Sequence, residues 1–454
     1  LQNERMQNQK TFSDGACKPP KEVSQMKRVV APKSKSYEHR ILICELLSKL
    51  GEADTLDAQG GLRETAGRSR AVTRESEDIM ATKGCVSEIE LSLSDGRREV
   101  VLDCNQSGST LRFLLPIACA LGLKARFLMR GRLAKRPMDE LINELKAHGC
   151  KIDKEDDTIC TSGKLEHGVF NLPGDISSQY VSGLLMALPL LSSDSEIHVK
   201  RLLVSAGYID VTLDVMRKFS ISVSEENSGS EYIYRIKGGQ RYILPEKYIV
   251  EGDWSNGAFW FALGVLGNEP LAIEGLNPNS LQGDRRIFDI LREMGADVYA
   301  IIDNDKAVFE AYPLGNKALK AIVLDAENIP DLVPLIAILA CFTDGKSKIT
   351  GIKRLRLKES DRLLAIEELI DGLGGSIKTR EDVIEISGLG AGEMLRGGEA
   401  RCFDDHRIVM SAATSSLRCR EDVLIDNAFA VNKSYLGFFD ELDRLGLSGK
   451  CIRK

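Results

Sequence analysis

The chain repeats one pattern six times: a short polar cluster stands directly before a strongly apolar segment that is rich in small residues. The six copies read SKSYEHR then ILICELL, NQSGSTLR then FLLPIACAL, DISSQY then VSGLLMALPLL, DWSNGA then FWFALGVLG, IPDLVP then LIAILACF, and DDHR then IVMSAATSSL. The marker residues Ser36, Gly108, Ser178, Ser255, Asp331 and Asp405 follow one another at intervals of 72, 70, 77, 76 and 74 residues. A period this regular indicates a repeated structural module.

Each repeat combines helices with strands. Amphipathic helices that end near a turn residue are predicted in MDELINELKAHG, DVTLDVMRKFS, RIFDILREMG, AIEELIDGLGG and YLGFFDELDRLG. Alternating runs broken by turn residues follow in CKIDKEDDTICTSG, ADVYAIIDNDKAVFEAY and GSIKTREDVIEISG, and these runs predict hairpins. The chain is therefore expected to consist of six small α/β modules.

The first helix of each module is apolar nearly all round, so we expect it to be buried with its polar cluster at the N-terminus. A helix N-terminus presents unpaired N–H groups and a partial positive charge, which favour anions. Six such ends brought together would bind anionic ligands. The alternative for any single copy is that Ser, Asp and Asn only cap the helix, although the Lys, Arg, Gln and His residues in these clusters are not capping residues.

Composition narrows the choice of ligand. The chain has 454 residues, enough for two or more domains, and its 61 Lys+Arg against 67 Asp+Glu leave a net charge of −6. This acidic balance argues against a nucleic-acid partner, because nonspecific affinity for nucleic acid needs a basic face. Any anion site must therefore be local.

The cysteines and the apolar stretches of the chain indicate the cellular compartment in which the protein is expected. The eleven cysteines include no Cys-x-x-Cys pair, so neither a zinc ribbon nor a thioredoxin-type redox pair is predicted, and their odd number fits reduced thiols in a cytoplasm. No apolar stretch approaches twenty residues and the start LQNERMQNQKTFSDG has no apolar core, so neither a membrane span nor a signal peptide is predicted. The polar segment 52–79 is expected to be a loop.

The nine residues RLRLKESDR, 354–362, concentrate four cations and two carboxylates. Their alternation predicts an extended run with Leu355 and Leu357 on one face, and Ser360 is expected to cap the following helix. This stretch is either a solvated charged face or an anion clamp with an acid beside it.

Ten segments, in order, resemble the 5-enolpyruvylshikimate-3-phosphate synthase family from about Val29 to Gly446. They are APKSKSYEHR, QSGSTLRFL, GRLAKRPMDEL, DISSQYVSGLLMALPLL, VSAGYIDVTL, VEGDWSNGAFW, IPDLVPLIA, RLRLKESDRLL, DDHRIVM and NKSYLGFFDEL. One such motif is a weak signal, whereas ten in the same order and approximate spacing are specific.

The resemblance implies an α/β fold, a two-domain inside-out α/β barrel. Six βαβαββ repeats would be shared between the domains, three in each, with pseudo-threefold symmetry. The implied boundaries give a discontinuous domain of residues 1–34 and 252–454, carrying the catalytic Asp, Glu and Arg, and a second domain of residues 35–251 that receives shikimate 3-phosphate. The active site would lie in the cleft between the domains.

The resemblance also implies an activity. The enolpyruvyl group of phosphoenolpyruvate would pass to the 5-hydroxyl of shikimate 3-phosphate by addition and elimination through a tetrahedral intermediate, with release of phosphate, in the route to the aromatic amino acids. Both partners are small molecules, and neither a metal nor an organic cofactor is implied. A monomer is expected.

The implied site residues fall into three groups. Proton transfer would fall to Lys35, Asp331 and Glu359: Asp331 would accept the hydroxyl proton, and Glu359 would protonate the methylene carbon and later remove a proton. Shikimate 3-phosphate would contact Lys35, Ser36, Arg40, Ser177, Ser178, Gln179, Ser205, Tyr208, Asp331 and Lys358. Phosphoenolpyruvate would contact Lys35, Gly108, Arg132, Gln179, Arg362, Arg407 and Lys433.

Two rival functions are considered. The related transferase that acts on UDP-N-acetylglucosamine usually carries a reactive Cys, or occasionally an Asp, in the loop before an Arg-Pro pair, and GRLAKRP has neither. A noncatalytic protein could bind a phosphorylated metabolite, but it would not need Lys35, Asp331 and Glu359 together.

Overall fold

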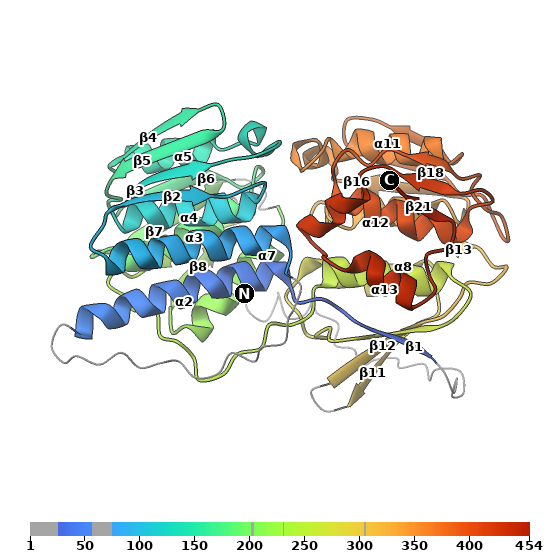
Figure 1. Ribbon diagram of the computed structural model, residues 1–454, viewed down its shortest axis with the longest axis horizontal. Coiled ribbons are helices and arrows are strands. Elements are labelled where there is room, and N and C mark those ends of the chain that lie inside the picture. Colours follow the sequence, from blue (N-terminus) through green and yellow to red (C-terminus); the bar gives the residue numbers. More distant parts are fainter. Residues whose placement is uncertain (1–25, 57–74, 201–203, 230, 304–305) are drawn as a thin grey trace. The chain divides into compact units, whose positions relative to one another are not determined.

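The computed structural model describes residues 26–56, 75–200, 204–229, 231–303 and 306–454. The chain forms two compact units, which we call the discontinuous unit (Leu1–Ser34 and Glu251–Lys454) and the continuous unit (Lys35–Val250). Figure 1 draws most of the discontinuous unit in yellow to red and the continuous unit in blue to green.

Glu251 lies in the discontinuous unit, one residue before the boundary expected from the sequence. Its carboxylate accepts hydrogen bonds from Asn277 and Gln282, each at 2.6 Å, and a further one from Ser280. All three donors belong to the discontinuous unit, so Glu251 is anchored there by its side chain.

Four sheets share one topology: two parallel strands are followed by an antiparallel hairpin whose last strand lies next to the parallel pair. Two of these sheets belong to the continuous unit, and their strands are given in spatial order. The first sheet consists of β2 (Glu99–Asp103), β3 (Lys124–Leu128), β5 (Thr158–Gly163) and β4 (Cys150–Glu155). The second consists of β6 (Val169–Pro173), β7 (Ser195–Lys200), β9 (Glu231–Ile236) and β8 (Val223–Asn227). The other two sheets belong to the discontinuous unit. One consists of β1 (Lys27–Val30), β10 (Leu271–Glu274), β12 (Lys306–Ala311) and β11 (Val298–Asp303). The other consists of β14 (Val323–Asp325), β16 (Lys346–Thr350), β18 (Val383–Ser387) and β17 (Ser376–Thr379).

The two remaining copies are shorter in strand content. The last copy has three parallel strands, β19 (Gly398–Ala400), β20 (Val423–Ile425) and β21 (Cys451–Arg453). The first copy consists, among the described residues, of two helices, α2 (Lys35–Leu56) and α3 (Glu77–Ser94). The central part of the expected polar loop, residues 57–74, lies outside the described residues. The prediction of a loop is wrong at both ends of the segment, because residues 52–56 belong to α2 and residues 77–79 to α3. A short pair, β13 (Leu319–Lys320) and β15 (Thr343–Asp344), completes the sheets that the structure describes.

The apolar segments form the buried helices that the sequence predicts. Besides α2, they are α4 (Gly108–Ala120), α6 (Ser178–Ala187), α8 (Trp254–Leu266), α10 (Val333–Ala340) and α12 (His406–Ser415). Every residue of α8, α10 and α12 is buried, and the three helices contact one another inside the discontinuous unit. Helices at the centre with sheets around them confirm the predicted α/β class.

The amphipathic helices are also present at the predicted places: α5 (Asp139–Ala147), α7 (Gly207–Lys218), α9 (Arg286–Glu293), α11 (Arg362–Gly372) and α13 (Phe438–Arg444). In the part of the chain that the structure describes, the connecting 3₁₀ helices are η1 (Leu133–Lys135), η2 (Leu188–Leu190), η3 (Gly283–Arg285), η4 (Lys353–Leu357), η5 (Ser416–Arg418) and η6 (Ala428–Lys433). No helix in the described ranges is both long and apolar enough to cross a membrane.

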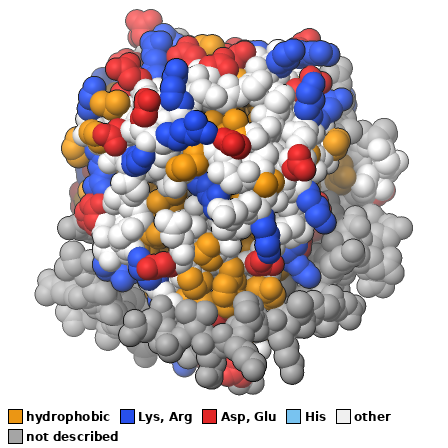
Figure 2. Space-filling model, turned by 90° about the vertical axis from the view of Figure 1, so that its right-hand side faces the viewer, with side chains coloured by type: hydrophobic (Ala, Val, Ile, Leu, Met, Phe, Trp, Pro, Cys, Tyr) orange, Lys and Arg blue, Asp and Glu red, His pale blue; other side chains and the backbone are white. Residues whose placement is uncertain are grey.

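On the face shown in Figure 2, basic and acidic side chains are interspersed. A single-sign basic surface, which a general polyanion binder needs, does not extend over the described residues of this face.

Candidate active site

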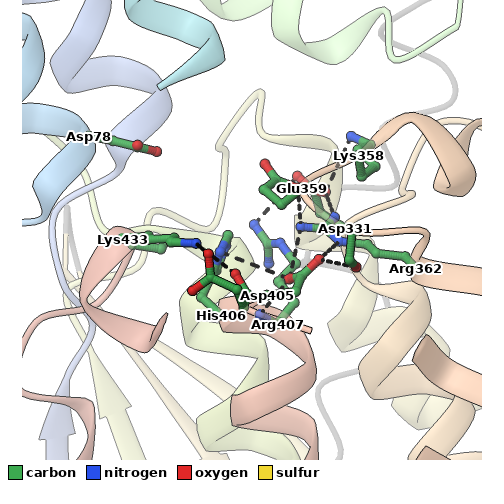
Figure 3. A network of polar contacts seen from close by, with 12 residues as sticks. Asp78, Asp331, Lys358, Glu359, Arg362, Asp405, His406, Arg407 and Lys433 are labelled. Atoms are coloured by element: carbon green, nitrogen blue, oxygen red, sulfur yellow. Dashed lines mark hydrogen bonds and ion pairs between the residues drawn. The ribbon is translucent and has the colours of Figure 1, made fainter. Parts of the chain in front are cut away.

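Arg362 is the centre of a polar cluster in the discontinuous unit. It opens α11, is 1% exposed, and donates hydrogen bonds to three carboxylates: Asp331 at 2.6 Å, Glu359 at 2.6 Å and Asp405 at 2.7 Å. Figure 3 shows these side chains converging from different segments. We call Asp331, Lys358, Glu359, Arg362, Asp405 and Arg407 the Arg362 cluster.

Asp331 faces three cations of this cluster. Lys358 and Arg407 each lie 3.4 Å from its carboxylate, in addition to Arg362. Burial alone would raise the pKa of Asp331, but Arg407, Lys358 and Arg362 together hold it well below the ordinary value. Asp331 is therefore ionised at neutral pH, and it does not cap α10, whose first flanking residue is Leu332.

Glu359 and Lys358 are the more accessible members of the cluster, with side chains 28% and 18% exposed. Burial lowers the pKa of Lys358, while the Asp331 carboxylate opposes that shift. An acid and an amine, consecutive in the chain, are thus the members of this cluster that are most exposed.

Asp405 holds the start of α12 against the start of α11. Its carboxylate accepts a hydrogen bond from the Arg407 backbone N–H at 3.0 Å and another from the Ser360 hydroxyl at 2.9 Å. Burial raises the pKa of Asp405, but the Arg362 guanidinium more than offsets this and lowers it. Asp405 is therefore an ionised N-cap that also orients Arg362.

Two sequence predictions about RLRLKESDR are wrong. Residues 353–357 form the 3₁₀ helix η4 instead of an extended run, so Leu355 is buried while Leu357 is 48% exposed. Side chains in a 3₁₀ helix do not alternate between two faces. The cap of α11 is Asp361, which accepts from the Leu364 N–H, because the Ser360 hydroxyl is bound to Asp405.

Two further charged side chains, Lys433 and Asp284, contact residues at the ends of these helices or beside them. Lys433, at the end of η6, donates to the Asp404 backbone oxygen at 2.7 Å and pairs with the Asp404 carboxylate. Asp284 was not predicted from the sequence. It accepts a hydrogen bond from Ser255, and burial, followed by the Asp331 charge, raises its pKa to about 7.

In the continuous unit, Gly108 begins α4 beneath two guanidinium groups. A Cβ at Gly108 would lie 2.6 Å from Nη1 of both Arg112 and Arg136, so only glycine fits there without displacing them. Arg112 also donates to Gln179 at 2.9 Å, and Gln179 donates to Ser109 at 2.9 Å. The predicted residues Gly108 and Gln179 are thus joined through Arg112.

The start of α6 brings the predicted serines together. Ser177 is the N-cap, and its side chain accepts from the Gln179 N–H at 3.3 Å, while Ser178 opens the helix and is buried. The Ser177 hydroxyl therefore serves as a cap in this structure, which is the simpler role weighed for such residues.

Arg40 lies inside the continuous unit. It donates to the Ser36 carbonyl at 2.6 Å, to the Tyr208 carbonyl at 2.9 Å and to the Thr212 hydroxyl at 2.6 Å. Burial lowers the pKa of Arg40 to about 10. The guanidinium joins the starts of α2 and α7, so three predicted residues, Ser36, Arg40 and Tyr208, lie at one place.

Lys35 forms an ion pair with Asp78 of α3, at 2.7 Å, with both side chains 19% exposed. Ser205 and Arg132 lie in turns. Ser205 is buried with φ of 57° and accepts from the Tyr208 N–H at 3.1 Å. Arg132 is exposed just before η1, and its carbonyl accepts from the Lys135 N–H at 3.0 Å.

Sequence reasoning did not assign a role to Asp78, Arg112, Asp284 or Asp405. A signal was available for Arg112, because it is the one charged residue in the otherwise apolar helix GSTLRFLLPIACA and stands one turn after Gly108. Among the described residues, no group of three or more His, Cys, Asp or Glu side chains could hold a metal ion.

A family model described as EPSP synthase (3-phosphoshikimate 1-carboxyvinyltransferase) matches residues 20–442. This chain belongs to the EPSP synthase family. Relatives named 3-phosphoshikimate 1-carboxyvinyltransferase include one from Clostridium perfringens, 38% identical over 429 residues, which cover 92% of this chain and 95% of that protein. Another, from Methanocaldococcus jannaschii, is 36% identical over 433 residues, with the same coverage of 92% and 95%.

Solved structures agree with the fold of an EPSP synthase. The EPSP synthase from Acinetobacter baumannii matches with a TM-score of 0.68 and 22% identity, covering 93% of this chain and 96% of that one. The enolpyruvyl transferase NikO from Streptomyces tendae matches with a TM-score of 0.63 and 16% identity, covering 93% and 95%. The family predicted from the ten motifs is confirmed.

Proposed function

We propose that this EPSP synthase family member transfers the enolpyruvyl group of phosphoenolpyruvate to the 5-hydroxyl of shikimate 3-phosphate. The hydroxyl oxygen adds to C2 of phosphoenolpyruvate while C3 gains a proton, which gives a tetrahedral intermediate with a methyl group. The C2–O bond to phosphate then breaks, phosphate leaves with the electron pair, and the methyl group loses a proton. No oxidant or metal is needed for this balance.

The observation that carries the proposal is the Arg362 cluster. It holds two carboxylates, Asp331 and Glu359, on one buried guanidinium at 2.6 Å each, with Lys358 and Arg407 beside Asp331. The reaction needs two separate proton carriers and several cations for anionic substrates. A noncatalytic binder needs the cations but not both acids.

We assign the proton of the 5-hydroxyl to Asp331 and the methylene proton to Glu359. The cations that now hold the pKa of Asp331 down are the same groups that we expect to bind the phosphate and carboxylate of phosphoenolpyruvate. An anion that draws Arg407 and Lys358 toward itself weakens their hold on Asp331, and the carboxylate becomes a better base. Binding of the donor would thus activate the base.

Roles in the continuous unit follow from its contacts. Gly108, Arg112 and Arg136 form a crowded cationic site at the start of α4, which suits an anion of the donor. Arg40 orients Ser36 and Tyr208 through hydrogen bonds to their carbonyls. It donates to four protein acceptors in all, the other two being the hydroxyls of Ser182 and Thr212. We expect the remaining guanidinium N–H to bind the carboxylate of shikimate 3-phosphate. Lys35, paired with Asp78, would act at the reacting centre. We also expect a monomer in a reducing cytoplasm; the ten described cysteines carry free thiols.

The test is phosphate release from phosphoenolpyruvate with two acceptors, shikimate 3-phosphate and UDP-N-acetylglucosamine. We expect release only with shikimate 3-phosphate. Asp331→Asn should lower kcat by about 100-fold or more, the usual contribution of a positioned base. The matched control is Asp325→Asn, which changes an exposed carboxylate in the nearby strand β14. Release with the UDP sugar alone would replace this proposal by the rival transferase.

A further inference from the structure

A line of hydrogen bonds runs through the interior of the continuous unit and connects three helices. His39 Nδ1 lies 2.7 Å from the Thr82 hydroxyl, Thr82 lies 2.6 Å from the Thr110 hydroxyl, and Thr110 donates to the Ser107 hydroxyl at 2.7 Å. All four residues are buried. The line thus begins on α2, passes through α3 and ends at the N-cap of α4.

Proton counting gives this line one direction. Each hydroxyl has a single proton, and Thr110 uses its own on Ser107. The Thr82 hydroxyl also lies 3.3 Å from the Asp78 carbonyl, but the 2.6 Å contact with Thr110 is much shorter and has no other proton to fill it. That contact is therefore a donation from Thr82. Since the Thr82 proton is used there, its contact with His39 must be a donation from the imidazole, so His39 carries its proton on Nδ1.

The surroundings of the other ring nitrogen of His39, Nε2, also favour a neutral imidazole. Nε2 is buried and has no hydrogen-bond partner among the described residues. Burial, then the charges of Lys35 and Arg40, lower the pKa of His39 well below its ordinary value. A second proton on Nε2 would place an unsatisfied cation between two others, so the ring stays neutral and its Nδ1–H remains the donor.

The two ends of the line lie next to residues of the proposed active site. His39 is one helical turn from Lys35 and adjacent to Arg40 on α2, and Ser107 directly precedes Gly108 on α4. The middle residue, Thr82, lies one turn after Asp78, the partner of Lys35. Ser107 accepts from both the N–H and the hydroxyl of Thr110, so the line fixes the first turn of α4.

We infer that His39 is a positioning residue: its Nδ1–H, acting through Thr82 and Thr110, sets the place of Ser107 and Gly108 relative to the helix that carries Lys35. The inference rests on the proposed function, in which Gly108 receives phosphoenolpyruvate. Loss of the line should weaken binding of phosphoenolpyruvate more than binding of shikimate 3-phosphate.

The tautomer can be measured without changing the line. The measurement is NMR of the ring nitrogens in the full chain labelled with ¹⁵N-histidine. The chain has five histidines, and the signals of His39 are identified as those that are missing from the spectrum of His39→Asn. At neutral pH we expect a protonated Nδ1 and an unprotonated Nε2. A proton on Nε2, alone or together with Nδ1, would overturn the inference. This result does not depend on turnover, so it is distinct from a failure of the proposed function, which absence of phosphate release by the wild type would show.

Kinetics test the positioning. Thr82→Val removes the middle hydroxyl at nearly constant volume and should raise KM for phosphoenolpyruvate about three- to tenfold, the worth of one neutral hydrogen bond. KM for shikimate 3-phosphate should change much less. The matched control is Thr161→Val, which removes a buried hydroxyl that contacts Cys119 at the other end of α4. Equal changes in both KM values, or none, would overturn the inference.

A conservative replacement separates positioning from general stability. The amide nitrogen of Asn occupies nearly the place of Nδ1, whereas that of Gln lies one carbon farther out. We therefore expect His39→Asn to keep KM for phosphoenolpyruvate closer to the wild-type value than His39→Gln does. The reverse order would contradict a role for the Nδ1 donor. If Thr82→Val does not fold, the tautomer measurement and this pair still decide the question.

Discussion

The Arg362 guanidinium lies 2.6 Å from the Asp331 carboxylate and is almost wholly buried. The same guanidinium binds Glu359 and Asp405, so the two proposed proton carriers are held by one side chain. In the proposed mechanism, the stability of the discontinuous unit and catalysis therefore depend on the same residue.

Arg362→Met should destabilise the protein by about 3–5 kcal/mol, because it leaves buried carboxylates without their partner. The deficit should shrink as the pH falls, since protonation removes the unpaired charges. Urea unfolding at several pH values measures this. The control is Arg356→Met, which breaks an exposed pair with Asp361 in the same segment and should change stability by less than about 1 kcal/mol. Equal losses in the two variants would contradict the account.

Asp284 should make stability depend on pH in the opposite direction from an ordinary buried ion pair. Its pKa rises from 3.8 to about 7, so the folded state binds this proton more tightly than the unfolded state. That contribution, roughly 4 kcal/mol at most, is complete below about pH 4 and is lost as the pH rises through about 7. The Asp284→Asn variant has no carboxyl group at this position, so it lacks this pH-dependent contribution to stability. The wild type should therefore lose stability relative to Asp284→Asn between acidic and slightly basic pH, and a constant difference in unfolding free energy would disprove this.

Gly108→Ala should impair the donor site while leaving the fold intact. The added Cβ would lie 2.6 Å from both Arg112 and Arg136, whose flexible ends must move. We expect KM for phosphoenolpyruvate to rise about tenfold or more, equal to about 1.4 kcal/mol, with little change in KM for shikimate 3-phosphate. Gly84→Ala in α3 is the matched control, because its Cβ would meet nothing within 4 Å. An unchanged KM for phosphoenolpyruvate in Gly108→Ala would argue against this site.

Much of the fold could be predicted from the sequence because the signals are local and repeated. The buried helices follow from apolar segments such as FWFALGVLG, and the β11–β12 hairpin follows from alternation around Asn304 and Asp305. The 3₁₀ helix at Lys353–Leu357 could not be predicted from the alternation of RLRLK, because its contacts are distant in sequence. Leu355 is buried, and the N–H groups of Ile352 and Lys353 donate to the Asp382 carboxylate.

The residues proposed for the site could be selected from the sequence, but the pairs that they form could not. Asp331 and Glu359 stand in recognisable motifs, yet their common partner Arg362 is a matter of tertiary geometry. Asp78 pairs with Lys35, which is 43 residues away in the sequence, and no local sequence pattern predicts such a contact. The choice of Asp361 over Ser360 as the cap of α11 also depends on Asp405, 45 positions beyond Ser360.

The most direct test of the addition and elimination steps, and of Glu359 as the carrier of the methylene proton, is turnover in D₂O, followed by mass spectrometry of the product and of the remaining phosphoenolpyruvate. Addition converts the methylene group into a methyl group that receives one solvent deuteron from Glu359, and elimination then removes one of three hydrogens. We predict deuterium in the vinyl group with the wild type, and neither exchange nor turnover with Glu359→Gln, which should still bind both substrates. Turnover by the wild type without deuterium in the vinyl group, or unchanged exchange in Glu359→Gln, would contradict the account.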